Sequence, residues 1–128
     1  MTYTRDYVYS TVADAVLAAF PSARCTGRFT PTPAVLPNVY IYELDRSHTL
    51  SGMNLQGTDV QWESTFEVQV TAPNSTVAYS IMDTVTESFR GMYYRLRSEY
   101  ENDDGQKFYL IGQFRRFVGG GDEVPTTQ

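Results

Sequence analysis

Apolar residues recur at helical spacing in two parts of the chain. Between Thr4 and Phe20 they lie three or four positions apart, at Val8, Val12, Ala15, Val16 and Ala19. This spacing predicts one helix, which Pro21 ends. A second run has four-residue steps, at Val77, Ile81, Val85 and Phe89. It predicts a helix with Asn74 or Ser75 as its N-cap and Gly91 as its C-terminal stop.

Other segments show the two-residue period of a strand. The clearest runs from Val60 to Ala72, where only Ser64 interrupts an apolar face made of Val60, Trp62, Phe66, Val68 and Val70. "VYIYELD" at 39–45 predicts a second strand, and "ARCTGRF" at 23–29 a short one. Pro31, Pro33 and Pro37 keep strands in that region short or at a sheet edge. Residues 92–100 and 107–118 flank the turn "ENDDG" and predict a hairpin.

These elements predict a two-layer α+β fold. Two amphipathic helices would cover one face of a mainly antiparallel sheet, and the hairpin would close it. The length of 128 residues suits one domain, which we place at 1–118. The last ten residues, "GGGDEVPTTQ", are rich in glycine and polar residues, so we expect 119–128 to be a flexible tail.

Composition excludes several classes of protein. The formal net charge is -5, which argues against a protein that coats phosphate backbones. Cys25 is the only cysteine, so neither an internal disulfide nor a cysteine zinc site is expected. No apolar run is long enough to cross a membrane, and residues 1–9 lack the apolar core of a signal peptide. We therefore expect no membrane association and a reducing cytoplasm as the place of synthesis.

Catalytic and cofactor chemistry finds little support. His48 is the only histidine, so a metal cluster built on histidines is excluded and a catalytic triad would depend on this one residue in a polar segment. Asp103 and Asp104 lack the spacing of a calcium loop and suit a turn. Cys25 has no histidine near it in sequence and suits a small, half-buried position. No phosphate-binding glycine motif occurs. We expect a protein that is not an enzyme and binds no cofactor or metal.

One basic and aromatic cluster favours an alternative function. Arg90, Arg95 and Arg97 accompany Tyr93 and Tyr94, a combination that can hold single-stranded nucleic acid. If Tyr94 and Leu96 face the core, however, Arg95 and Arg97 share a solvated outer face with Tyr93. Arg115 and Arg116 are adjacent in a strand, so they must point to opposite faces.

Partner contacts are expected in three places. The segment "RSHTLSGMNLQGT" at 46–58 predicts a long loop, which is either a partner-binding loop or a plain hairpin connection. Glu63 and Glu67 lie on the polar face of the long strand, as solvated or interfacial charges. The tail adds two acidic residues. The complete set of expected contacts is Arg46, His48, Leu50, Met53, Leu55, Asp59, Glu63, Glu67, Asp122 and Glu123.

The order of elements resembles a known family, the small tail terminator or tail completion proteins of long-tailed bacteriophages. The resemblance covers residues 8–118 and rests on "AAFP", "PNVYIYELD", "WESTFEVQVTA", "STVAYSIMDTVTESFRGM" and "ENDDGQKFYLIGQFRRFV". The closing segment looks similar to the family's through Asn102, Asp103, Asp104, Tyr109, Arg115, Arg116 and Phe117. The chain departs from the family at "GMYYRLRSEY", where the family commonly has a short Gly-Phe start to the next strand.

This resemblance implies a structural protein of the virion with no catalytic residues. Such a protein forms a ring, of six subunits in that family, on the last ring of the tail tube protein. It presents a docking face to the head-side connector or stopper protein at the neck. Assembly would take place in the host cytoplasm. An acidic lumen, with Glu63 and Glu67 as the candidate residues, would let DNA pass without specific binding. Another head-tail connector or minor tail protein is the alternative within this class.

Overall fold

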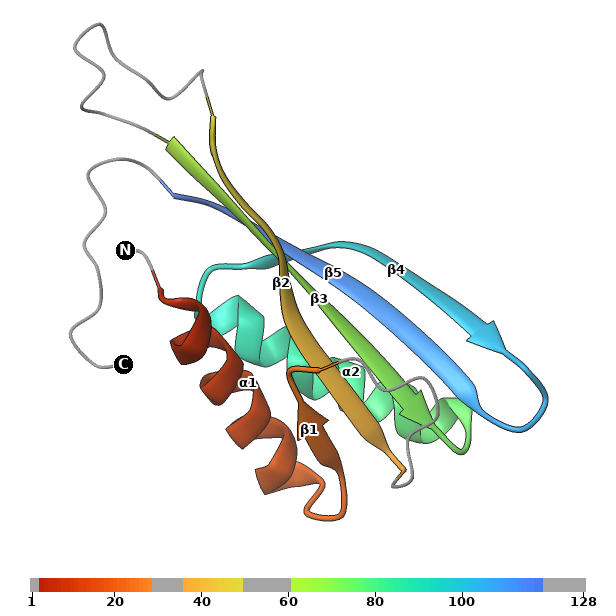
Figure 1. Ribbon diagram of the computed structural model, residues 1–128. Coiled ribbons are helices and arrows are strands. Elements are labelled where there is room, and N and C mark those ends of the chain that lie inside the picture. Colours follow the sequence, from red (N-terminus) through yellow and green to blue (C-terminus); the bar gives the residue numbers. More distant parts are fainter. Residues whose placement is uncertain (1–2, 29–35, 50–60, 119–128) are drawn as a thin grey trace, which may run out of the picture.

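The computed structural model of the chain describes residues 3–28, 36–49 and 61–118 (Figure 1). In chain order its elements are α1 (Arg5–Ala19), β1 (Arg24–Thr26), β2 (Asn38–Thr49), β3 (Gln61–Ala72), α2 (Ser75–Gly91), β4 (Arg95–Asp103) and β5 (Phe108–Val118). The strands form one sheet in the order β1-β2-β3-β5-β4. Only the β1–β2 pair is parallel, and the other three pairs are antiparallel.

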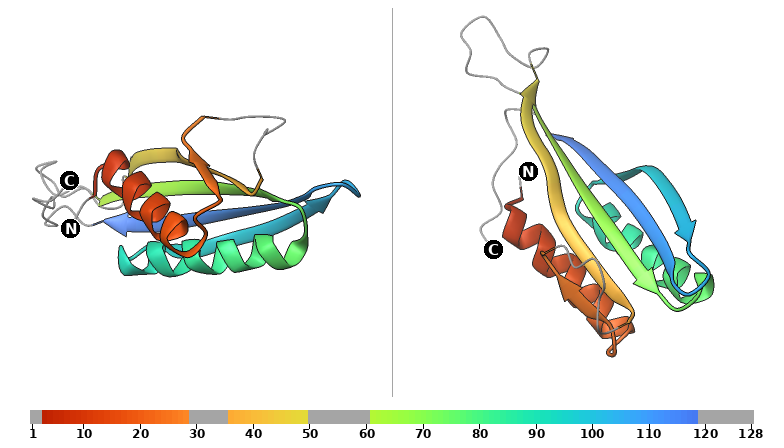
Figure 2. Two further views of the ribbon diagram at one scale, coloured as in Figure 1. Left: turned by 90° about the horizontal axis from the view of Figure 1, so that it is seen from below. Right: turned by 45° about the vertical axis from the view of Figure 1, so that its right-hand side comes forward.

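The predicted two-layer α+β class is confirmed. Both helices lie on the same side of the sheet, α1 beside β1 and β2 and α2 under β3 and β5 (Figure 2). The core between the layers is aromatic and aliphatic. Phe89 of α2 stacks on Phe114 of β5 with ring centroids 4.3 Å apart, and it lies 5.7 Å from the ring of Phe66 of β3. The predicted tail, 119–128, lies outside the described residues.

Both predicted helices are present, with one difference at a terminus. Thr4 caps α1 and Asn74 caps α2, each through a side-chain oxygen that accepts a backbone N–H three residues on. Gly91 is the last residue of α2, as predicted, but its φ is not positive as in the usual glycine stop. Tyr93 takes the left-handed conformation instead, with φ 67°. The reversal is held by the N–H of Tyr94, which donates to the carbonyl of Phe89 at 2.9 Å.

Strand β2 is longer than the sequence predicts. It continues to Thr49, so Arg46–Thr49 belong to the sheet and the prediction of a loop there was wrong. Alternation alone missed this extension because β2 contains a bulge between Glu43 and Asp45, which shifts the pattern by one residue. The rest of the predicted loop, 50–58, lies outside the described residues.

Strand β4 is exposed along its whole length. The expectation that Leu96 faces the core together with Tyr94 was wrong in part, because Tyr94 is buried and Leu96 is 41% exposed. A bulge between Leu96 and Ser98 accompanies this change. Among the described strands β4 is the last of the sheet, with β5 as its one neighbour.

Candidate assembly surfaces

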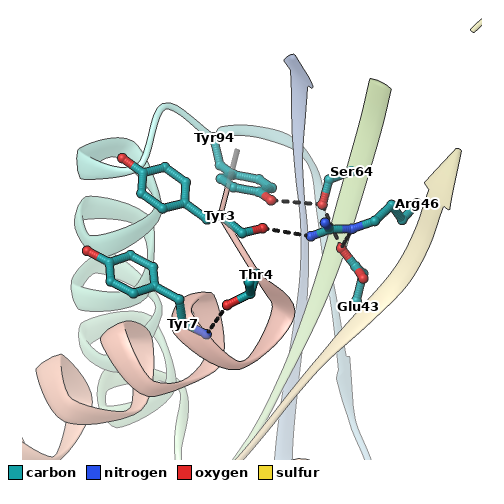
Figure 3. Close-up of polar contacts among 7 residues, drawn as sticks. All are labelled: Tyr3, Thr4, Tyr7, Glu43, Arg46, Ser64 and Tyr94. Carbon is teal, nitrogen blue, oxygen red and sulfur yellow. Dashed lines mark hydrogen bonds and ion pairs between the residues drawn. The ribbon is translucent and has the colours of Figure 1, made fainter. Parts of the chain in front are cut away.

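A buried polar cluster occupies the end of the core near the start of α1 (Figure 3). The hydroxyl of Tyr94 donates to Ser64 Oγ at 2.8 Å, and Ser64 Oγ donates to Glu43 Oε2 at 2.8 Å. Arg46 Nε also donates to Glu43 Oε2 at 2.8 Å, and its Nη2 donates to the carbonyl of Tyr3 at 2.9 Å. Burial raises the pKa of Tyr94. The cluster ties the N-terminal segment to β2, β3 and the start of β4.

This cluster gives two residues, Ser64 and Arg46, structural roles that the sequence did not predict. Ser64, which interrupts the apolar face of the long strand, is the polar junction of the cluster, and alternation could not distinguish such a role from a defect. Arg46 was expected to contact a partner from a loop. Its guanidinium instead pairs with Glu43 and Tyr3 inside the subunit.

Arg115 and Arg116 point to opposite faces, as predicted. The guanidinium of Arg116 lies 5.1 Å from the ring centroid of Tyr3 and 5.5 Å from that of Tyr93. Arg116 is only 7% exposed, and its Nη1 has no hydrogen-bond partner among the described residues. Burial raises the pKa of Tyr3, and the nearby charge of Arg116 opposes that rise. The exposed ring of Tyr93 thus covers a buried cation.

The face of the sheet opposite the helices, which we call the outer face, is polar and aromatic. Tyr42, Glu67 and Gln113 lie level with one another on β2, β3 and β5. The rings of Tyr40 and Tyr42 stack 4.5 Å apart. Glu67 is only 6% exposed, and Gln113 Nε2 donates to its carboxylate at 3.1 Å. Of the two alternatives predicted for Glu67, a solvated charge was therefore wrong, and an interfacial charge stays a prediction.

Glu63 is also paired on this face. Its carboxylate lies 3.1 Å from Arg115 Nε, and the same guanidinium lies 4.8 Å from the ring centroid of Phe117. The side chains of Glu63 and Arg115 are both partly exposed. Because Arg115 offsets its charge, Glu63 contributes little net negative potential to this face.

Large apolar side chains are exposed along the edges of the sheet and on its outer face. Leu44 of β2 is 48% exposed, Leu96 of β4 is 41% exposed, and Phe117 of β5 is 51% exposed. Tyr93 and Tyr100 each expose more than half of their surface. Alternation could not identify the exposed Leu44, Leu96 and Tyr100, because it assigns apolar positions to the core. Only the bulges and the strand order place them outside it.

The remaining predicted contacts are only partly described. His48 lies in β2 opposite Trp62 of β3 and not in a loop. The other six, Leu50, Met53, Leu55, Asp59, Asp122 and Glu123, lie outside the described residues, and their roles stay predictions.

The basic cluster of the α2–β4 connection is only partly assembled. Arg90 and Arg95 line a hollow of about 460 Å³ together with Thr86, Tyr94 and Leu96. Arg90 pairs with Glu87 at 2.7 Å on the exposed surface of α2. Tyr94 was expected to offer a ring for stacking, but it is buried in the core, so Tyr93 alone exposes a ring here.

The described residues offer no evident reactive centre. Across 3–28, 36–49 and 61–118, no three His, Cys, Asp or Glu side chains are grouped as a metal site would require. Burial and the neighbouring Asp14 raise the pKa of Cys25 to about 11, which disfavours the nucleophilic thiolate. Asp104 Oδ1 accepts the N–H groups of Gln106 and Lys107, which lowers the pKa of Asp104 and fixes the hairpin turn.

No helix in the described part of the chain has the length and apolarity needed to span a bilayer. The sequence matches no protein-family model, and a search of curated proteins found no match. Among solved structures, the fold is similar to the sheath/tube terminator of PVC, an extracellular contractile injection system, in the extended state. The TM-score is 0.41 at 10% identity, and the match covers 100% of this chain and 62% of that one. So low a score carries no inference about function.

Proposed function

We propose that this chain is a structural, non-enzymatic subunit of a bacteriophage virion that forms a ring with copies of itself at the neck. The ring, of six subunits, would sit on the last ring of tail tube protein and stop further addition. Its opposite side would bind the head-side connector or stopper protein. The role in termination comes from the resemblance of the sequence elements to tail terminator and tail completion proteins.

The observation that carries the proposal is the half-covered sheet. Two helices bury one face, while the outer face and two long stretches of sheet edge carry neither helix nor strand in the described part of the chain. Exposed Leu44, Leu96 and Phe117 lie on these open regions. Exposed strand edges are typical of surfaces that pair with another chain. A subunit with different open edges on its two sides joins head to tail and closes into a ring when the rotation permits.

Passage of DNA is part of the same proposal and rests on net charge alone. A formal charge of -5 disfavours binding to phosphates. Glu63 and Glu67, our candidates for an acidic lumen, give weak support, because one is paired with Arg115 and the other is buried.

The first test is the native mass of the purified protein over a range of concentrations, with negative-stain images of large species. Rings of six subunits are expected. A matching genetic test removes the gene from its phage and images the particles. Overlong or headless tails are expected for a terminator, whereas normal tails beside leaking heads would move the protein to the head side of the neck. Unchanged, infectious particles would contradict the proposal.

Binding of single-stranded nucleic acid is the second candidate. It is favoured by the hollow that Arg90 and Arg95 line, and by the exposure of Tyr93 two residues before Arg95 in the sequence. An oligonucleotide titration at increasing salt would test it, since binding through two or more phosphates gives affinity that falls steeply with salt. Absence of binding at low salt would remove this candidate.

A further inference from the structure

The sheet has two open edges on opposite sides of the subunit. Strand β1 pairs with β2 only from Asn38 to Tyr40, so in the described chain no strand lies beside β2 from Ile41 onward. At the other side, β4 is exposed throughout, and within 3–28, 36–49 and 61–118 its one partner strand is β5. Unpaired edges present rows of free backbone donors and acceptors, which are templates for another strand.

The two open edges match each other in height and shape. The bulge of β2 follows Glu43, which pairs with Phe66, and the bulge of β4 follows Leu96, which pairs with Phe114. Phe66 and Phe114 are themselves directly paired between β3 and β5. Both bulges therefore lie at the same level of the sheet, one on each edge.

Strand direction makes the two edges compatible. Three successive antiparallel pairs separate β2 from β4, so β4 runs antiparallel to β2. A second copy placed beside the first in the same orientation would bring its β4 antiparallel to β2. Along the part of the β2 edge that β1 leaves open, this arrangement continues the antiparallel pattern of the sheet.

At that common level the side chains are complementary. Pairing level for level brings Arg95 of one copy opposite Asp45 of the next, because both residues lie at the level of the Thr65–Arg115 pair. The two bulges then meet, with exposed Leu96 near exposed Leu44. Opposite charges and apolar pairs across strands stabilise a sheet, so this register is favourable.

There is space for an added strand beside β2. A hollow of about 610 Å³ adjoins the open edge at Ile41–Glu43. Its other walls are the first turns of α1, through Arg5, Asp6 and Tyr9, and the end of β1 with residues 27 and 28. The hollow thus lies where a strand that followed on from β1 along β2 would run.

We propose that β4 of one copy pairs antiparallel with the open edge of β2 in the next copy, joining Arg95–Glu99 to Ile41–Asp45. This inference rests on the proposed ring and names the contact that closes it. The pairing stops at Ile41 because β1 covers the edge of β2 below that point. Beyond Glu99 the hairpin tip therefore passes outside the plane of β1. The contact is head to tail, so it can repeat around a ring.

Charges and bulges on an edge strand often serve to prevent such pairing. Strand β4 carries both, with Arg95, Arg97, Glu99, Glu101 and Asp103 as its charged residues. Protection of β4 against pairing, however, would not require a bulge, an opposite charge and an exposed leucine at the same level of β2. The coincidence of bulge, charge and apolar side chain at one level distinguishes a pairing edge from a protected one.

A cysteine pair tests the contact directly. Tyr42→Cys and Ser98→Cys would be combined in a Cys25→Ser background, because Tyr42 and Ser98 lie level with each other outside the bulges. Within one chain β3 and β5 separate them, which is roughly 14 Å and too far for a disulfide. Mild oxidation should therefore give a ladder of cross-linked oligomers on a denaturing gel. The matched control pairs Tyr42→Cys with Asn102→Cys, four residues further along β4, and should give less than about a tenth of the ladder.

The outcomes separate this contact from the proposed function. Native rings that do not cross-link through residues 42 and 98 would overturn the contact and leave ring formation standing. If the chains cross-link but deletion of the gene leaves the phage tails normal, the contact would be supported and the role in termination contradicted. A protein that stays monomeric and uncross-linked at every concentration would overturn the contact.

A charge exchange provides a second test that does not depend on disulfide geometry. Arg95→Glu should weaken self-association about tenfold, since it places two acidic residues opposite each other. Adding Asp45→Arg to the same chain should restore association. Circular dichroism would show whether each variant folds, and the Arg95 change lies on the exposed strand β4. Failure of the exchange to restore association would argue against the register.

Discussion

Strand β3 has buried residues on both of its faces, and the two sets are buried in different ways. On the inner face Phe66, Val68 and Val70 are covered by the helices and are completely inaccessible. On the outer face Thr65 and Glu67 are almost as inaccessible, yet neither helix of the described residues lies there. The inner face depends on apolar packing between layers. The outer face depends on hydrogen bonds and ion pairs between long side chains on neighbouring strands.

This difference shows how a small domain can keep a polar surface stable without a covering layer. An apolar outer face would need a cover to be stable in water, whereas a polar face paired within itself remains stable when open. Residues Glu67, Gln113, Glu63 and Arg115 supply such pairing. The outer face is therefore preorganised before any partner binds, which reduces the entropy lost on association.

The largest expected difference between the faces comes from two phenylalanines of β5. Phe114→Ala should lower the free energy of unfolding by about 3–5 kcal/mol, because it leaves a cavity against the stacked ring of Phe89. Phe117→Ala, on the exposed outer face, should cost less than about 1 kcal/mol. Urea denaturation of both variants would measure this. Similar losses for the two variants would contradict the assignment of the faces.

The reactivity of Cys25 in β1 tests how well the inner face of the sheet is buried at that edge. Its Sγ lies 4.0 Å from the carbonyl of Ala13 in α1, and burial raises its pKa to about 11. At pH 8 alkylation should be roughly 10- to 100-fold slower than for the urea-unfolded chain, because less thiolate is present. The unfolded thiol ionises first as pH rises, so this residue lowers stability above about pH 9. A folded-state rate equal to the unfolded rate would contradict the buried position.

The buried polar cluster tests whether polar pairing inside the core resembles that on the outer face. Ser64→Ala should destabilise the protein by about 1–3 kcal/mol, since it leaves the Tyr94 hydroxyl and Glu43 each without one partner. Adding Tyr94→Phe should recover part of this loss, because the unsatisfied hydroxyl is then absent. A double-mutant cycle would measure the coupling. Purely additive losses would mean that the hydroxyl finds another partner.

The outer ion pair should have the smallest effect. Arg115→Gln breaks the contact with Glu63, and because both side chains are partly exposed the cost should be below about 1 kcal/mol. High salt should reduce it further through screening. Arg116→Gln is the matched comparison one residue away, with a buried guanidinium packed on Tyr3 and Tyr93. A loss for Arg115→Gln that is large and independent of salt would show that the outer face is not built from weak exposed pairs.

Much of the fold, and little of the assembly surface, was predictable from the sequence. The helices and the long strand were predicted because their periodicity is unbroken from Val8 to Val16, from Val77 to Phe89 and from Phe66 to Val70. The extension of β2 and the exposure of Leu96 were missed because each strand contains a bulge. A bulge shifts the two-residue pattern by one position, and the local sequence pattern does not predict where it occurs.

The sequence by itself determined the elements, the two-layer class and the absence of familiar catalytic motifs, because these depend on local spacing and residue type. Only the tertiary structure decided that β1 joins β2 in parallel, that Glu67 is buried, and that the bulges of β2 and β4 lie at one level. These facts depend on which distant segments become neighbours across the sheet. That choice minimises the free energy of the whole packed chain, so no single segment contains it.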